Sequence, residues 1–135
     1  MIGYGNSELD AVLRVAAAKQ GMALIPEPTP EAGYYYRSDH FNLAKQGVPM
    51  LYAKSGVDSP KYGPEYGKQW LENYIANIYH KPGDEYDAAW ETAGILKELR
   101  IYYDVGMAVA NDDGWPRWRE GSEFRAIREE SRNTR

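Results

Sequence analysis

The sequence contains no cysteine, which excludes disulfide bonds and thiolate metal ligands anywhere in its 135 residues. Histidine is almost as scarce, since only His40 and His80 occur. No apolar run approaches the length of a membrane span, so we expect no membrane partner. The opening residues, MIGYGNSELD, lack the basic and apolar regions of an export signal, and the compartment therefore stays open.

Several catalytic patterns are also missing. The sequence has no Gly-x-Ser-x-Gly, no Gly-x-x-x-x-Gly-Lys and no Gly-x-Gly-x-x-Gly, so nucleophile elbows, nucleotide hydrolysis and dinucleotide binding have no support. A net charge of -4 argues against nucleic acid as the main partner. With 43% hydrophobic and 27% charged residues, the chain is typical of one soluble globular domain over residues 1–135.

The first half of the chain alternates between helical and strand patterns. Apolar residues at helical spacing, with Ser7 before them and Gly21 after them, predict a helix over residues 8–20. Residues 22–26 read as a short buried strand, and Ser38 is placed to cap a helix that runs to Gln46. Residues 48–53 form a second apolar strand pattern. This order favours an α/β layer with parallel strands.

The second half begins with a Gly-, Pro- and Tyr-rich stretch, residues 55–68, which predicts a long surface loop. A helix is expected over residues 69–80, a longer one from Thr92 to Asn111, and a polar one from near Ser122. The broad apolar face of the Thr92–Asn111 helix, which includes Ile95 and Leu99, predicts packing against a sheet. Few strands with four or five helices make half of an α/β sandwich, so the domain looks incomplete.

The two histidines allow more than one interpretation. His80 precedes Asp84 by four residues across a Pro-Gly turn, a spacing that suits a zinc ligand oriented by a carboxylate, or an exposed histidine beside a turn. Asp39 before His40 suits a carboxylate that stabilises a helix start. A zinc site needs three or four protein ligands, which two histidines and scattered carboxylates do not easily supply. The aromatic residues are best explained by packing.

Four segments together resemble the C-terminal portion of the bacterial zinc aminopeptidases. This dizinc exopeptidase family also includes the glutamate carboxypeptidase branch. The segments are YYYRSDHFNLAKQGVPMLY, YHKPGDEYD, DVGMAVAN and WPRWREGSEF, and the resemblance covers nearly the whole chain. It implies a partial three-layer α/β/α sandwich, in which a mixed sheet lies between helix layers and two zinc ions lie at the C-terminal ends of the strands.

The resemblance also implies roles for particular residues. His80 corresponds to the family's last zinc ligand, and Asp84 to the carboxylate that orients it. Tyr79 or Tyr35 corresponds to the tyrosine that polarises the scissile carbonyl in some members. The edge of the substrate pocket corresponds to three consecutive residues, Ser38, Asp39 and His40.

The family's other metal ligands and its catalytic glutamate have no counterparts here. Asp112–Asp113 and Glu129–Glu130 look similar but follow His80 instead of preceding it, and they are explained by a turn and a solvated helix face. We therefore expect weak zinc binding at most and no activity from this chain alone. The resemblance implies two partners, a peptide substrate in the intact enzyme and a missing N-terminal part. It also suggests that the intact enzyme is exported or periplasmic. The alternative is a non-catalytic α/β module that self-associates.

Overall fold

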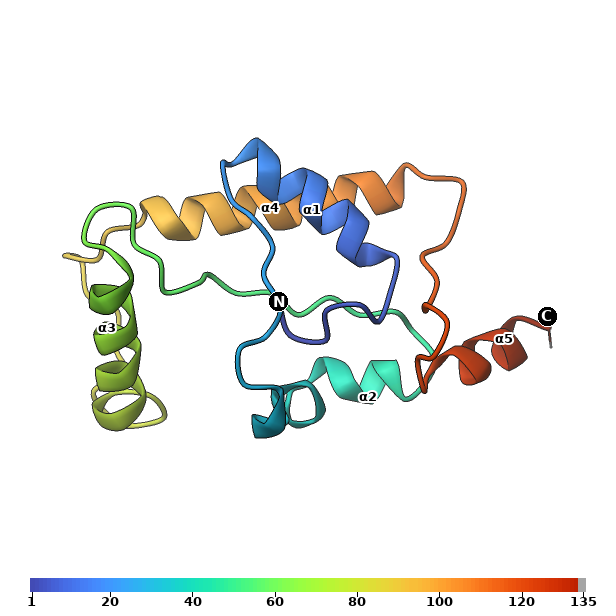
Figure 1. The fold of residues 1–135 in the computed structure, drawn as a ribbon, viewed down its shortest axis with the longest axis horizontal. Helices are drawn as coiled ribbons and strands as arrows, with labels where there is room; N and C mark the ends of the chain where they lie inside the picture. The colour runs from blue at the N-terminus through green and yellow to red at the C-terminus, as the bar shows by residue number, and fades with distance from the viewer. Residues whose placement is uncertain (134–135) are drawn as a thin grey trace. The chain divides into compact units, whose positions relative to one another are not determined.

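The structure, a computed structural model, describes residues 1–133 and divides the chain into two compact units (Figure 1). The larger unit comprises Met1–Ala53 and the segment from Ile95 onward, and the smaller unit comprises Lys54–Gly94. Within the described residues, no helix combines the length and the apolar character needed to cross a membrane.

The larger unit contains most of the helices. The predicted helices are confirmed here, although the second is a short five-residue segment. Two turns of 3-10 helix come before that segment, and Gly33 lies between them. Its φ of 64° is easily reached only by glycine. The elements are α1 (Leu9–Lys19), η1 (Pro30–Ala32), η2 (Tyr34–Arg37), α2 (His40–Ala44), α4 (Ala93–Ala110, which begins in the smaller unit) and α5 (Arg125–Asn133).

The predicted parallel strands are wrong for the described residues. Segments 22–26 and 48–53 are extended chain without a strand ladder (Figure 1). The β pairing recorded in the larger unit consists of two isolated antiparallel bridges, Ile2 with Tyr52 and Ser7 with Trp118. The Met1 ammonium also donates to the Ile25 carbonyl at 2.7 Å, so the N-terminus lies between the two extended segments. A strand needs a hydrogen-bonded neighbour along its length, and these segments have one only at single residues. The predicted three-layer sandwich is therefore not established.

Alternate residues of the extended chain nevertheless face two different apolar clusters. Leu51 and Ala53 pack with α1 and α4, whereas Met50 and Tyr52 pack with α2 and η2. The first cluster is built on Leu13, Ala16, Ala17, Ile101 and Val105, and the second on Ile2, Tyr35, Ala44, Trp118 and Phe124. The two-residue period of a strand is thus present in the packing although the ladder is absent.

The face of α4 that is predicted to pack against a sheet is exposed over much of its length. Ile101 and Val105 are the buried residues of this helix. Val109 of the predicted face packs with the cluster on α1. Ile95 and Leu99 of the same face are 46% and 60% exposed. No sheet covers them within residues 1–133, because the extended segments pack on the other side of the helix.

The smaller unit is organised by one helix, α3 (Pro64–Asn77). It begins inside the stretch predicted to be a loop and ends three residues before His80, so both predicted bounds are corrected. Pro64 explains the early start, because its fixed φ and missing N–H suit the first turn of a helix. The loop before the helix packs closely on it, since a Cβ added at Gly67 would lie 2.0 Å from the Val57 carbonyl oxygen.

Candidate functional site

His80 occupies the turn that follows α3, and its side chain is exposed. Its φ of 55° lies in the left-handed region, which histidine reaches more readily than most residues. The ring of Tyr79 stacks on the imidazole with centroids 3.9 Å apart and planes 24° apart. The Tyr79 backbone N–H donates to the Tyr74 carbonyl at 2.8 Å, which anchors this turn to the end of the helix. The imidazole is thus held on an ordered turn with its edge open to solvent.

Asp84 contacts a different side chain from the one predicted. Its carboxylate accepts a hydrogen bond from the Tyr74 hydroxyl, with oxygen separations of 3.1 and 3.3 Å. Desolvation and this hydrogen bond raise the pKa of Tyr74. No hydrogen bond between His80 and Asp84 is recorded in the described part of the chain. The orienting role of Asp84 therefore stays a prediction, and Tyr74 links it to the stack formed by Tyr79 and His80.

The residue missed by sequence reasoning is Tyr74. Its ring lies 5.4 Å from Trp70 in a nearly parallel stack and 5.8 Å from Tyr79, so ring contacts run without interruption from Trp70 to His80. The signal is visible in the sequence, because Tyr62, Tyr66, Trp70 and Tyr74 recur at every fourth residue. Residues four apart lie on one side of a helix.

The second group of predicted residues lies in the larger unit. Tyr35 is part of its apolar core, with 6% of its surface exposed. The hydroxyl oxygen is buried and has no hydrogen-bond partner among the described residues. Burial, followed by the nearby Tyr36 and Glu123, raises the pKa of Tyr35 to about 12. A buried hydroxyl that stays protonated is a donor, but here it faces protein rather than solvent.

His40 lies between two tyrosine rings, 4.7 Å from Tyr35 and 5.1 Å from Tyr52. Its Nε2 atom is buried and has no hydrogen-bond partner within residues 1–133. Burial lowers the pKa of His40, and the neighbouring Asp39 opposes that shift, so the neutral imidazole is favoured. The Ser38 hydroxyl donates to the Tyr34 carbonyl at 3.0 Å instead of capping α2, which corrects the predicted capping role. Asp39 is exposed at the N-cap position directly before α2, where its negative charge suits the helix start.

The described residues do not by themselves make a zinc site. No group of three or more His, Asp, Glu or Cys side chains that could hold a metal occurs among them. His80 fits the chemistry of one zinc ligand, since it is exposed and its ring is oriented by Tyr79. The carboxylate closest to it in the sequence, Asp84, is engaged by Tyr74. A complete zinc site thus needs further ligands that residues 1–133 do not gather.

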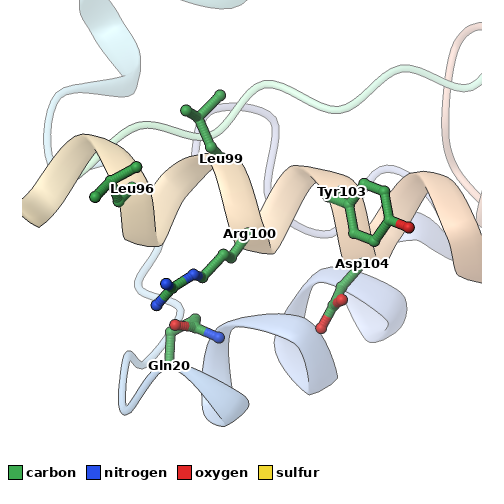
Figure 2. A pocket seen from close by; sticks show the side chains of 6 residues that line it. All are labelled: Gln20, Leu96, Leu99, Arg100, Tyr103 and Asp104. Carbon is green, nitrogen blue, oxygen red and sulfur yellow. The ribbon is translucent and has the colours of Figure 1, made fainter.

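Two shallow hollows in the described part of the larger unit are lined by none of the predicted site residues. One, with a volume of about 550 Å³, lies between the end of α1 and the outer side of α4 (Figure 2). It is lined by Gln20, Leu96, Leu99, Arg100, Tyr103 and Asp104. The other, of about 390 Å³, is bordered by Glu8, Val12 and the turn around Trp115. Neither hollow marks a peptide cleft at the predicted rim residues.

Comparison with known proteins identifies the family. A family model described as Peptidase family M28 matches residues 1–103, about three quarters of the chain. The chain belongs to Peptidase family M28. The match includes two of the four segments that carry the resemblance, those around His40 and around His80, and the other two lie beyond it. The metallopeptidase assignment is thus confirmed at the level of the family. The observed fold, which is mainly helical, is compatible with part of an α/β peptidase domain of this family. No match to the chain was found among curated proteins or among solved structures.

Proposed function

We propose that this M28 chain is one part of a zinc-dependent aminopeptidase of the bacterial type, related to the glutamate carboxypeptidase branch. In this proposal it contributes His80 as one zinc ligand and Ser38, Asp39 and His40 as the rim of a peptide-binding pocket. The supporting observation is the family match over residues 1–103, which contains both segments. Peptidases of this family generally use zinc.

The residues of the smaller unit support the proposed role of His80. The His80 backbone is left-handed, and the stacked Tyr79 ring limits the rotation of the imidazole. Strained backbone at an exposed polar residue is a feature that often accompanies functional sites. Tyr79 is 48% exposed, so its hydroxyl is free to donate to a substrate carbonyl.

The second part of the proposal is that the chain alone is inactive. The small number of zinc ligands that it supplies supports this part. One imidazole binds zinc weakly, because structural and catalytic zinc sites use three or four protein ligands. The remaining ligands and the catalytic glutamate would come from another polypeptide segment. The absence of a metal-holding cluster among residues 1–133 also favours the second candidate, a non-catalytic α/β module that self-associates.

Zinc titration followed by NMR tests the role of His80. Because the chain has only two histidines, the ring signals are assigned by two variants, His80→Asn and His40→Asn. Asparagine also tolerates the left-handed conformation, so His80→Asn is expected to fold normally. We expect zinc to shift the His80 signal and to leave the His40 signal unchanged, since the His40 Nε2 is buried. A response of His40 alone, or of neither ring, would refute the ligand assignment.

Activity is measured in the same preparations with an aminoacyl nitroanilide and added zinc. We expect no turnover above background from the wild-type chain. Turnover that disappears in His80→Asn but persists in His40→Asn would show that this chain completes its own metal site, and the proposal of inactivity would then be wrong.

A further inference from the structure

Helix α4 has a second apolar face in addition to the one that packs on α1. A helix advances by roughly 100° per residue, so the side chains of this second face cover an arc of about 120° that excludes Ile101 and Val105. Its large members are Ile95, Leu96, Leu99, Tyr103 and Met107, which are 46%, 49%, 60%, 67% and 46% exposed. Gly106 and Ala110 lie on the same face towards the C-terminal end of the helix.

Figure 2 shows part of this face in the larger unit. Leu96, Leu99 and Tyr103 project from α4, while the side chains of Arg100 and Gln20 approach one another below the helix. Single exposed apolar residues are common on protein surfaces, but a contiguous face of this kind usually marks a binding surface.

We propose that the outer face of α4 binds the same face of a second copy of this chain, with the two helices antiparallel. The interface has two-fold symmetry, so a contact between two different positions of the two copies occurs twice, once in each direction. The two-fold axis lies near the peptide bond between Tyr102 and Tyr103.

The sizes of the side chains favour this arrangement. The N-terminal half of the face carries the bulky Ile95 and Leu99, and the C-terminal half carries the small Gly106 and Ala110. About the proposed axis, Leu99 lies opposite Gly106 of the second copy, and Ile95 lies opposite Ala110. No atom lies within 4 Å of a Cβ added at Gly106, so the space above it is open. A parallel pair would instead place bulky residues against bulky ones and leave a gap at the glycines.

The charges beside this face are complementary in the same register. Arg100 and Asp104 lie on one flank of the apolar face, and in an antiparallel pair this flank faces the same flank of the second copy. Arg100 of each copy then approaches Asp104 of the other. Asp104 already receives the Lys19 ammonium at 3.0 Å, while no ion pair of Arg100 is recorded in the described residues. The contact therefore supplies Arg100 with a carboxylate twice in each dimer.

The area is sufficient for a weak but specific dimer. Five large side chains, each about half exposed, offer on the order of 500 Å² per copy, given roughly 150–250 Å² for a fully exposed aromatic side chain. The pair would bury on the order of 1,000 Å², near the lower limit of specific interfaces. Dissociation constants in the micromolar range are expected for such a contact.

Sedimentation analysis of the full chain in EDTA tests the proposal, because EDTA removes metal bridging. We expect the wild-type chain to dimerise at micromolar concentrations. Leu99→Glu should raise the dissociation constant at least ten-fold. Val15→Glu is the matched control, since Val15 is 62% exposed on α1 and lies outside the face, and it should change the constant less than three-fold. A wild-type chain that stays monomeric, or equal effects of the two variants, would overturn the proposal.

Cysteine cross-linking tests the orientation and does not depend on the folding of Leu99→Glu. The chain has no cysteine of its own, so each introduced thiol reports one position. Tyr103→Cys lies near the axis and should form a disulfide-linked dimer under mild oxidation. Leu96→Cys should not, because two copies of position 96 are about 20 Å apart in an antiparallel pair, at 1.5 Å per residue. Efficient cross-linking at both positions would indicate a parallel pair, and cross-linking at neither would exclude this interface.

Discussion

Replacing Tyr35 with phenylalanine is expected to stabilise the larger unit. The tyrosine ring is packed in the core against His40 and Phe124, but its hydroxyl is buried and has no hydrogen-bond partner among the described residues. Phenylalanine keeps the ring and removes the group that lost its hydrogen bonds to water on folding. Burying an unpaired hydroxyl costs about 1–3 kcal/mol in protein mutational data, so a gain of about 1 kcal/mol is a moderate expectation.

The same substitution should alter the response to alkaline pH. The pKa of Tyr35 is raised to about 12 in the folded chain, whereas an unfolded tyrosine titrates near its ordinary value of 10.0. The contribution of Tyr35 to stability is therefore fully present below pH 10 and is lost as the pH rises towards 12. Tyr35→Phe removes this loss, so its advantage over the wild type should be larger at pH 11 than at pH 8.

Urea unfolding at the two pH values, followed by circular dichroism, measures both effects. Tyr36→Phe is the matched control at pH 8, where both tyrosines are protonated, because the Tyr36 hydroxyl is exposed and donates to the Glu123 carboxylate at 2.9 Å. Loss of that exposed hydrogen bond should cost at most about 1 kcal/mol. If Tyr35→Phe instead destabilises the chain by 1 kcal/mol or more at pH 8, the hydroxyl has a partner and the account of this core given above is wrong.

Two further predictions concern His40 and Gly67. Burial lowers the pKa of His40, so the stability that its neutral form provides is present above pH 6.5 and is lost as the pH falls through the lower, folded-state value. His40→Gln should therefore reduce the difference in the free energy of unfolding between pH 7.5 and 5.5, by at most about 1.4 kcal/mol per pH unit for one proton. Urea unfolding measures this difference, and an unchanged value would contradict the burial of this imidazole. Gly67→Ala should destabilise the smaller unit by about 1–3 kcal/mol, because its Cβ would overlap the Val57 carbonyl. Gly94→Ala is the control and should not destabilise this unit, because no atom lies within 4 Å of the added Cβ. Hydrogen exchange of the α3 amides measures both effects, and equal exchange rates in the two variants would contradict the prediction.

Helices were predictable from the sequence because their signals are local. Apolar spacing and glycine placed α1 and α4 within a few residues of their observed bounds. The start of α3 does not follow from the Gly- and Pro-rich pattern of residues 55–68, which predicts a loop, although Pro64 suits the first turn of a helix. Strands are over-predicted, since segments 22–26 and 48–53 are apolar runs of strand length but find no continuous neighbour in residues 1–133. Pairing is a long-range property that a local pattern does not contain.

In the candidate site, too, local features follow from the sequence and long-range contacts do not. The exposure of His80 and its closeness to Tyr79 follow from adjacent positions in the sequence, and both are present. The engagement of Asp84 by Tyr74 depends on how the turn folds back on α3, and the spacing of His80 and Asp84 suggested a different contact. The burial of Tyr35 was missed for a related reason, because its core partners include Trp118 and Phe124, more than eighty residues later in the chain.

The surfaces that this chain leaves uncovered need two different kinds of partner. Among residues 1–133, eleven hydrophobic residues are buried, whereas twenty-three large hydrophobic side chains are exposed, so association offers a substantial gain in burial. The outer face of α4 presents side chains and is satisfied by apolar contact alone. The extended segments instead present backbone groups, such as those of Ala23 and Met50, for which no hydrogen bond is recorded in the described residues. Water hydrogen-bonds to such groups where they are exposed, and an added strand can replace that water. Dimerisation through α4 therefore leaves the extended segments open, and a partner that completes them could bind either the monomer or the dimer. For this reason Leu99→Glu should separate the copies without changing the response of His80 to zinc, whereas loss of both together would show that the two surfaces are coupled.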